Sequence, residues 1–387
     1  MSYAAVELDP VALVASPVER WLDLVRRNGA LGDLADVYLE YPPVQGEIIF
    51  TGACAYTCSH CIYPPDFAAA NRSLEPEVWA GLFRSMHREL GINTFVYGGR
   101  SVSSPGIETL KALRRTVPGA HVGLIDNAVS FVPFRKELVD LRLDWIDISV
   151  DGDERSHDLQ RGKQGGYQET IAGLDWLVQN RAAPKINILT CLTALNIESV
   201  VPMIKALSAQ GLPNYFITPV AFLEGVRPNP ALRVDGDSFR RFVDTLVREL
   251  PVLDDVWIEL VFSDAGLLAS LLESHPDWVS RMSSDRDSLI FDLSADGPKV
   301  GTRNQLLLRY CPLSMTGTRE FIVNTNGDVV VPKSVGYGKI PDSLVVGNLT
   351  LQSPATLYRS LVASKAFEFY TSEFRQEREL LRPFLRK

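Results

Sequence analysis

Cysteine is scarce in this sequence: there are five cysteines in 387 residues, an odd number. A small domain stapled by disulfides uses many more of them in even numbers, so we exclude that class of protein. Long hydrophobic runs are missing as well, since no stretch approaches the roughly 20 apolar residues that span a membrane. Glu7 and Asp9 stand where a secretory signal peptide carries lysine or arginine. We therefore expect a cytoplasmic protein with no membrane partner.

The sequence also lacks any block of lysine and arginine. Its 39 basic and 47 acidic residues give a net charge of −8, so the electrostatic footprint of a nucleic-acid-binding protein is absent. What it does have is 46% hydrophobic and 22% charged residues, the composition of a globular protein. The length fits two or three domains, or one large α/β unit with an appendage.

Three of the five cysteines lie within eight residues, as Cys54-x3-Cys58-x2-Cys61. Thiols concentrated in one loop, in a chain that otherwise avoids cysteine, indicate a metal site. Three ligands leave one position open, which holds water in zinc enzymes and leaves one iron free in a four-iron cluster. The competing interpretation is a structural zinc site with His60 or a distant residue as fourth ligand. Such sites usually pair two Cys-x2-Cys hooks, and the sequence has no second hook.

Strand and helix patterns alternate after the cysteine loop. An apolar strand pattern at residues 46–52 ends where the loop begins. Further strand patterns at 93–97, 121–125, 145–150, 185–193 and 215–219 follow helix patterns at 75–90, 106–115, 134–141, 167–180 and 197–210. This alternation predicts βαβ units in an α/β fold, with a parallel sheet that forms a partial barrel or an open sheet. Sites in such sheets lie at the carboxyl ends of the strands, so we expect the cysteine loop on the functional face.

The remaining segments predict two flanking regions. Residues 1–45 resemble a short helical cap, and glycine and proline cluster around 225–235. Beyond that point we expect helices at 239–250, 266–273 and 355–378, an irregular stretch at 274–310, and a hairpin at 320–331 that turns at Asn326-Gly327. We therefore divide the chain into a cap (1–45), a barrel (46–225) and a smaller α+β C-terminal extension (226–387).

Five landmarks together resemble one known family. C-x3-C-x2-C after a first strand is similar to the signature of radical S-adenosylmethionine (radical SAM) enzymes. Gly98-Gly99-Arg100, Asp126-Asn127 and Ser149-Val-Asp151-Gly152 follow the next three strands, and His157-Asp158-Leu-Gln-Arg161-Gly162 comes after them. This order resembles the branch that includes molybdopterin-precursor and SPASM/Twitch enzymes. The resemblance implies a partial (β/α)6 barrel with parallel strands and a Twitch-like C-terminal extension.

The resemblance also implies the cofactors and their ligands. Cys54, Cys58 and Cys61 would ligate a [4Fe-4S] cluster whose fourth iron takes S-adenosylmethionine. Gly98 and Gly99 would let the backbone approach the methionyl end closely. The residues that would contact S-adenosylmethionine itself are Asn127, Ser149 and Arg161.

Two departures from the family pattern concern Arg100 and the C-terminal region. Arg100 replaces a glutamate that accepts hydrogen bonds from the methionyl ammonium in relatives; arginine has no acceptor, and Asp126 is an alternative. The usual places of auxiliary-cluster cysteines read Val-Val-Val-Pro332-Lys333, and Cys311 is the one thiol of that region. One thiol cannot hold a cluster, so we predict a Twitch-like extension without auxiliary iron.

The function that the resemblance implies is that of an oxygen-sensitive radical SAM enzyme. We expect it to act in natural-product biosynthesis on a small polar substrate such as a sugar, aminocyclitol, nucleoside or amino-acid derivative. A flavodoxin or ferredoxin type of protein would supply single electrons. Without an auxiliary cluster a redox-neutral outcome is favoured, and Cys311 is the candidate donor that returns a hydrogen atom to the substrate. Cys191, inside an apolar strand pattern, is interpreted as a core thiol.

Two alternatives stay open. The first is an enzyme that modifies a ribosomally made precursor peptide. Many such enzymes carry a leader-binding domain before the first strand, and the 45 residues in that place here argue against this arrangement. The second is a non-catalytic iron-sulfur scaffold, which only Arg100 supports.

Overall fold

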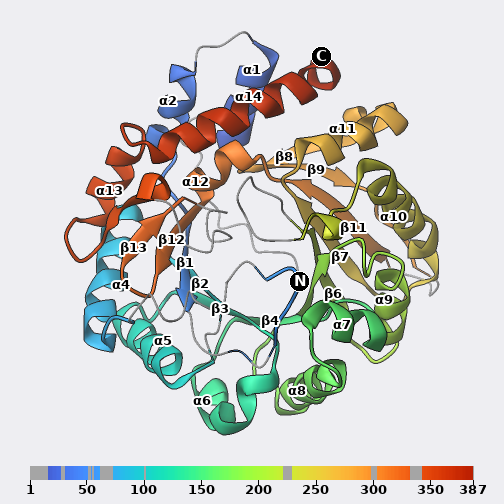
Figure 1. Cartoon of the computed structure of the whole chain (residues 1–387), viewed down its shortest axis with the longest axis horizontal. Coiled ribbons are helices and arrows are strands. Elements are labelled where there is room, and N and C mark those ends of the chain that lie inside the picture. Colours follow the sequence, from blue (N-terminus) through green and yellow to red (C-terminus); the bar gives the residue numbers. More distant parts are fainter. Residues whose placement is uncertain are drawn as a thin grey trace.

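The computed structural model describes residues 16–27, 31–50, 54, 56–61, 73–99, 102–220, 229–297, 303–331 and 342–386. Its strands form an inner ring and its helices surround that ring (Figure 1). Among the described residues, fourteen strands belong to one sheet. Their order along the main path is β14-β13-β12-β1-β2-β3-β4-β5-β6-β7-β11-β9-β8, with β10 paired to β11.

The six predicted barrel strands are confirmed, and each is parallel to the next. They are β1 (Gln45–Phe50), β2 (Thr94–Gly99), β3 (His121–Asp126), β4 (Trp145–Ser149), β5 (Ile186–Leu192) and β6 (Asn214–Pro219). The helices between them are α4 (Pro76–Leu90), α5 (Ser104–Thr116), α6 (Arg135–Asp140), α7 (Glu154–Arg161), α8 (Gly166–Asn180) and α9 (Val200–Ser208). The α/β class and the partial barrel follow from this topology.

The C-terminal region adds parallel strands to both edges of the same sheet. β7 (Trp257–Phe262) and β11 (Arg303–Tyr310) continue it beyond β6, and β12 (Glu320–Asn324) pairs with β1 at the other edge. The prediction that 274–310 is irregular is wrong, because β8 (Met282–Asp285), β9 (Ser288–Asp292) and β11 lie there. Charged residues interrupt these strands, because Arg309 of β11 pairs with Glu259 of β7 and Asp285 of β8, so the apolar pattern that we used to find strands is broken. The division at residues 45 and 225 stays a prediction.

The predicted hairpin at 320–331 is confirmed. β12 pairs antiparallel with β13 (Asp328–Val330), which pairs antiparallel with β14 (Val345–Asn348). Gly327 in the turn has a φ of +88°, a conformation that glycine adopts readily. The other helices are α1 (Pro17–Arg26), α2 (Gly32–Glu40), α10 (Gly236–Glu249), α11 (Ala265–Ser274), α12 (Thr316–Arg319), α13 (Pro354–Leu361) and α14 (Ala366–Leu385).

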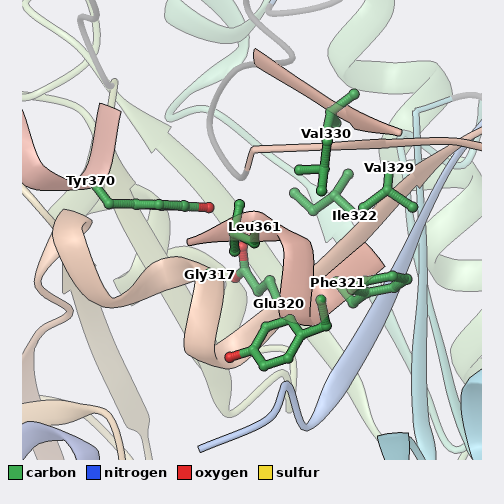
Figure 2. A pocket seen from close by; sticks show the side chains of 10 residues that line it. Gly317, Glu320, Phe321, Ile322, Val329, Val330, Leu361 and Tyr370 are labelled. Atoms are coloured by element: carbon green, nitrogen blue, oxygen red, sulfur yellow. The ribbon is translucent and has the colours of Figure 1, made fainter. Parts of the chain in front are cut away.

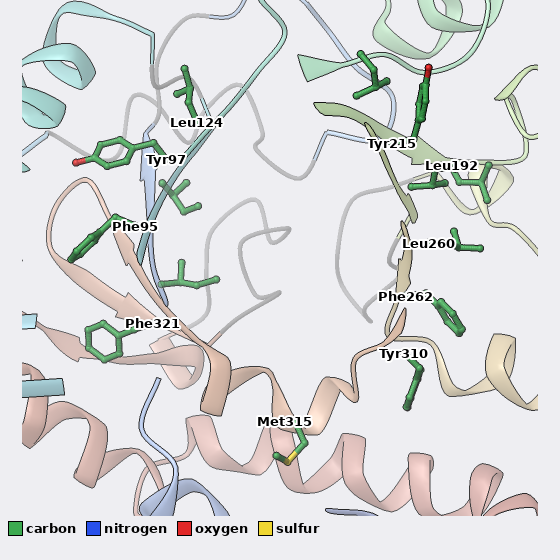
Figure 3. Packing of buried hydrophobic residues seen from close by; sticks show 14 of the residues in the cluster. Phe95, Tyr97, Leu124, Leu192, Tyr215, Leu260, Phe262, Tyr310, Met315 and Phe321 are labelled. Atoms are coloured by element: carbon green, nitrogen blue, oxygen red, sulfur yellow. The ribbon is translucent and has the colours of Figure 1, made fainter. Parts of the chain in front are cut away.

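The core lies between the sheet and the surrounding helices. Buried side chains such as Tyr97, Leu124, Tyr215 and Phe262 point away from the centre of the ring (Figure 3). Successive side chains of a strand face opposite sides of the sheet. The residues that precede and follow each of these apolar residues in its strand therefore face the interior of the barrel, its lumen. Several of them are polar.

The segment between β11 and β12 spans the open side of the barrel, because these two strands lie at opposite ends of the parallel run (Figure 1). Ser314 fixes this segment to the surrounding helices. Its Oγ accepts a hydrogen bond from Trp21 Nε1 (3.0 Å), and its carbonyl accepts one from Tyr38 OH (2.6 Å). Its backbone N–H donates to Glu377 Oε1 of α14 (3.2 Å). In the part of the chain that the structure describes, hydrogen bonds to α1, α2 and α14 rather than strand pairing hold this side of the barrel.

We expect Glu377→Gln to change how stability depends on pH. Burial raises the pKa of Glu377 to about 7, so the folded state binds the proton more tightly than the unfolded chain does. The contribution of this group is fully present below about pH 4.5 and is lost as the pH rises through 7, by about 3 kcal/mol at most. In the glutamine variant this part of the decline disappears. Chemical unfolding of both proteins between pH 5 and 8 measures the difference, with Glu379→Gln on the exposed face of α14 as the control; parallel curves would contradict the assignment.

A cavity of about 20 Å³ lies beside the β12–β13 hairpin and is lined by apolar residues such as Phe321, Val329 and Leu361 (Figure 2). This volume holds at most one water molecule, so the cavity is not a substrate site. None of the described helices combines the length and the apolar character that crossing a membrane requires.

Candidate functional site

The cysteine loop follows the carboxyl end of β1, as the sequence predicts. Cys54 is exposed, and Cys58 and Cys61 are half-buried. Burial raises the pKa of Cys58 to about 11; nearby Cys61 and Cys54 add to this rise, and the charge of Arg161 opposes it. The three thiols are therefore close enough to influence one another. Bound metal cations would stabilise the thiolate forms of these three cysteines, because their positive charge offsets the negative charge of the thiolates.

Gly99 lets the ends of β1 and β2 meet. Its φ is +79°, and a Cβ on it would lie 2.0 Å from the carbonyl oxygen of Phe50. Gly98 is buried beside it and pairs with Ile49 of β1. Gly99 therefore approaches β1 closely, the strand that precedes the cysteine loop. The family resemblance alone does not assign this role to Gly99. Arg100 lies outside the described residues.

We expect Gly99→Ala to lower the free energy of unfolding by about 2 kcal/mol, through the positive φ and the contact with Phe50. Gly91→Ala is the matched control, because Gly91 has a similar φ of +71° but open space around the position of its Cβ. The control isolates the conformational cost of about 1 kcal/mol. Denaturant unfolding measures both variants, and equal losses would show that the contact with Phe50 carries no weight.

Asn127 lies beside the cysteine loop. Its Nδ2 is 4.0 Å from Cys54 Sγ, and its carbonyl accepts a hydrogen bond from Thr170 Oγ1 (3.0 Å). Asp126 supports this turn, because its Oδ1 accepts from the N–H groups of Asn127 (2.7 Å) and Ala128 (3.0 Å). Burial raises the pKa of Asp126 to about 6. Asp126 therefore holds the turn that presents Asn127, which leaves less of its carboxylate for a methionyl ammonium.

A buried ion pair connects the ends of β4 and α7. Arg161 Nε donates to Asp151 Oδ2 at 2.6 Å, and neither side chain is more than 9% exposed. Burial alone would raise the pKa of Asp151 and lower that of Arg161; the attraction between them outweighs burial, so the pKa of Asp151 is lowered and that of Arg161 is raised. Both groups stay charged. Arg161 thus brings a permanent cation to Cys58.

Two histidines border this pair in neutral form. Burial lowers the pKa of both His60 and His157 to about 4. His157 Nδ1 accepts the backbone N–H of Asp151 (3.2 Å), so its proton is on Nε2. Nε2 of His157 and Nδ1 of His60 are buried without a hydrogen-bond partner among the described residues. The other ring nitrogen of His60, Nε2, lies 3.8 Å from Asp151 Oδ2.

Ser149 and Cys191 line the lumen near the same site. Ser149 ends β4, is almost buried, and pairs with Leu189 of β5. Cys191 is half-buried on the lumen side of β5, in the register of Leu189, rather than in the apolar core. Its backbone N–H donates to Asp151 Oδ1 (2.9 Å), and its pKa is raised by burial and affected by the charges of Asp151 and Arg161. The interpretation of Cys191 as a core thiol therefore does not describe its surroundings.

Cys311 lies on a different part of the barrel from Ser149 and Cys191. It follows β11, three strands along the sheet from β5, and its N–H donates to the carbonyl of Phe262 (2.9 Å). Arg319 Nη1 donates to its Sγ at 3.4 Å. The structure thus places Asn127 and Arg161 beside the cysteine loop and Ser149 at the carboxyl end of β4, while Cys311 lies apart from them after the carboxyl end of β11.

The residues that sequence reasoning missed are Asp151 in its pairing role and Cys191. Asp151 belongs to a quoted motif, but nothing in the spacing says that its partner is Arg161, ten residues later. Cys191 sits in an apolar pattern that hides its inward orientation. Its place at the end of a predicted parallel strand was the available signal.

The donor set fits a cluster with one open iron. Three thiols in one loop supply three ligands, and the fourth iron is left for another molecule. Among the described residues, no three His, Cys, Asp or Glu side chains already surround the position of a single metal ion. The assignment of Cys54, Cys58 and Cys61 therefore depends on their chemistry and their position.

Comparison with known proteins supports the same family. Residues 48–207 match the Radical SAM superfamily, and comparison with curated protein sequences gives no match. The fold is similar to anSMEcpe with bound AdoMet, at 13% identity over 86% of this chain and 84% of that chain (TM-score 0.56). It is also similar to Streptococcus suis SuiB bound to precursor peptide SuiA, at 13% identity over 82% of this chain and 65% of that chain (TM-score 0.56). At these identities the likeness to solved structures shows the fold alone.

Proposed function

The chain is a radical SAM enzyme, with its superfamily domain at residues 48–207, and on this premise we propose that it transforms a small polar substrate without net oxidation. Enzymes of this superfamily use a [4Fe-4S] cluster and S-adenosylmethionine. When bound, these groups supply a 5′-deoxyadenosyl radical that abstracts a hydrogen atom from the substrate. The protein binds and orients these groups and excludes water.

We assign the binding roles to residues around the cysteine loop. Cys54, Cys58 and Cys61 would hold three irons. Arg161 suits the methionyl carboxylate, because its Nε is committed to Asp151 and a guanidinium has two further amino groups that can bind a carboxylate. Ser149 and Asn127 offer hydrogen bonds to the remaining polar groups of S-adenosylmethionine. Because Gly98 and Gly99 have no side chains, the end of β2 presents none toward S-adenosylmethionine.

The observation that carries the substrate class is the polar lumen wall of β7 and β11. Glu259 and Arg309 form an ion pair there, and Arg309 Nη1 also donates to Asp285 Oδ2 (2.9 Å) and Ser288 Oγ (2.8 Å). Arg309 alternates along β11 with the outward-facing Tyr310, so it faces the lumen. A wall of ionic and hydroxyl groups binds sugars, aminocyclitols, nucleosides or amino-acid derivatives better than apolar groups.

The cysteine inventory supports a redox-neutral outcome. Outside the loop these 387 residues contain only Cys191, on β5, and Cys311, directly after β11, and neither alone holds a second cluster that could accept electrons. A thiol can instead return a hydrogen atom to the substrate. We assign this role to Cys311, which stands at the carboxyl end of β11 and at the end of the polar wall. Its S–H bond would break as the substrate C–H bond forms, and an external flavodoxin or ferredoxin type of donor, with a solvent proton, would restore the thiol.

The second candidate is modification of a precursor peptide. The proteins of similar fold include anSMEcpe with the Cp18Cys peptide and SuiB with its precursor peptide. This observation favours a peptide substrate, because proteins of the same fold form their lumen from the same strands.

Substrate-stimulated formation of 5′-deoxyadenosine in deuterium oxide distinguishes the two candidates. We expect pools of amino sugars, aminocyclitols and nucleosides to raise the rate about tenfold or more, and one solvent deuterium to enter a product of otherwise unchanged mass. In Cys311→Ser we expect deuterium transfer to fall at least tenfold while 5′-deoxyadenosine still forms; Cys191→Ser is the control. A product two hydrogens lighter would contradict the redox-neutral outcome, and stimulation by peptides alone would favour the second candidate.

A further inference from the structure

The last carbonyl groups of α7 point at the cysteine loop. An α-helix leaves its final carbonyls without partners inside the helix. Here the carbonyl of Gln160 accepts the N–H of Ser59 (2.9 Å), and the carbonyl of Arg161 accepts the N–H of Thr57 (3.1 Å). The loop thus completes the end of the helix with its own backbone.

Side chains of the loop repeat this pattern. Thr57 Oγ1 donates to the carbonyl of Gly162 (3.1 Å), and Ser59 Oγ donates to the carbonyl of Gln160 (3.1 Å). Thr57 immediately precedes Cys58 and Ser59 immediately follows it. Four hydrogen bonds therefore hold both neighbours of this cysteine, and the direction of its Cα–Cβ bond is set by α7.

Gly162 makes the close contact possible. Its φ is +64°, and a Cβ on it would lie 2.4 Å from Thr57 Oγ1 and 2.7 Å from the carbonyl oxygen of Thr57. Only glycine allows the loop to approach the end of the helix this closely. The helix ends and the loop docks at the same residue.

The helix end is itself firmly placed. The side chain of Arg161 pairs with Asp151 after β4, and Gln160 Nε2 donates to the carbonyl of Cys191 on β5 (2.9 Å). A second anchor lies beyond the helix, where Tyr56 OH donates to the carbonyl of Gly166 (2.9 Å). Through these contacts, α7 fixes the position of the loop relative to strands β4 and β5.

From these contacts we propose that the end of α7 holds the cysteine loop in its metal-binding conformation before iron is present, with Thr57 and Ser59 as positioning residues. The backbone that carries Cys58 is then ordered during folding and not during cluster assembly, which strengthens metal binding. The proposal rests on the cluster cofactor and is independent of the substrate.

The rate of iron loss from the reconstituted protein tests the proposal. In the double variant Thr57→Val with Ser59→Ala, both hydroxyl bonds are absent while the backbone bonds stay. We expect an excess of an iron chelator to remove iron about tenfold faster than from the unchanged protein, the effect of losing two modest hydrogen bonds. The melting temperature of the iron-free protein should move by less than about 2 °C, since these bonds contribute little to the rest of the fold.

Thr116→Val is the matched control, because Thr116 Oγ1 makes a similar bond to the carbonyl of Ala112 (2.8 Å) on α5. We expect it to lose iron at the unchanged rate. In Gly162→Ala the added Cβ would displace the loop through its contact with Thr57, so we expect this variant to lose iron faster as well. Equal rates of loss in the double variant and the unchanged protein would overturn the proposal. So would a faster loss accompanied by an equally large drop in the stability of the iron-free protein. Absence of iron from the unchanged protein would instead contradict the cluster assignment itself.

Discussion

Replacement of Cys58 by alanine is expected to abolish both iron binding and S-adenosylmethionine cleavage. Cys58 is the middle ligand of Cys54-x3-Cys58-x2-Cys61, and a set of three thiols has no spare ligand. We expect iron to fall from about four per chain to below one after reconstitution. Formation of 5′-deoxyadenosine should drop at least about a thousandfold, because the cluster supplies the electron for cleavage.

The control for this prediction is Cys191→Ala. It removes the same group from the same side of the barrel, and the charges of Cys58 and Arg161 reach its thiol. We expect this variant to keep its iron and its cleavage activity within about threefold, since a wall thiol that is not a ligand contributes packing of about 1 kcal/mol or less. Iron and zinc analysis with a 5′-deoxyadenosine assay checks both variants. Full iron in Cys58→Ala, or one zinc and no iron in the unchanged protein, would contradict the assignment.

The barrel was predictable because its strands are apolar and its helices amphipathic. β2 to β6 carry outward-facing residues such as Tyr97, Leu124 and Tyr215 that pack on the helices. Strands β7 and β11 carry Glu259 and Arg309 on their other face, where each charge has a partner. Pairing makes a charge acceptable in a strand, but the partner is distant in sequence, so a local pattern cannot show it.

The site was predictable only in part for a related reason. The three cysteines lie within one loop, so their spacing reveals them. Asp151 and Arg161 act together because β4 and α7 end side by side, and Thr57 contacts Gly162 because α7 returns to the loop. These pairings depend on how the chain closes on itself. A motif can name such residues, but only the fold shows what they contact.

Asp151→Asn tests the most consequential of these pairings. The change leaves the guanidinium of Arg161 buried without its counter-charge, and breaking a buried pair in this way costs about 3–5 kcal/mol. We expect the free energy of unfolding of the iron-free protein to fall by that amount. The loss should be similar across pH 5 to 8, because the pKa of Asp151 is lowered and its contribution disappears only below the ordinary range of aspartate. Asparagine can still accept the N–H of Cys191, so the effect reports on the charge.

Two comparisons separate the charge from general damage. Asp140→Asn removes a carboxylate from an exposed pair with Lys136, and we expect no measurable loss there, because solvent screens an exposed ion pair. Adding Arg161→Met to Asp151→Asn should restore part of the stability, because the unpaired charge is then gone. Binding of S-adenosylmethionine should not recover in that double variant, since the proposed carboxylate partner is missing. Denaturant unfolding with calorimetric binding distinguishes the two effects: stability that returns without affinity would show that Asp151 serves the fold by holding Arg161, while Arg161 serves the cofactor. A loss below 1 kcal/mol in Asp151→Asn would mean that solvent reaches the pair, and Arg161 would then hold its position without it.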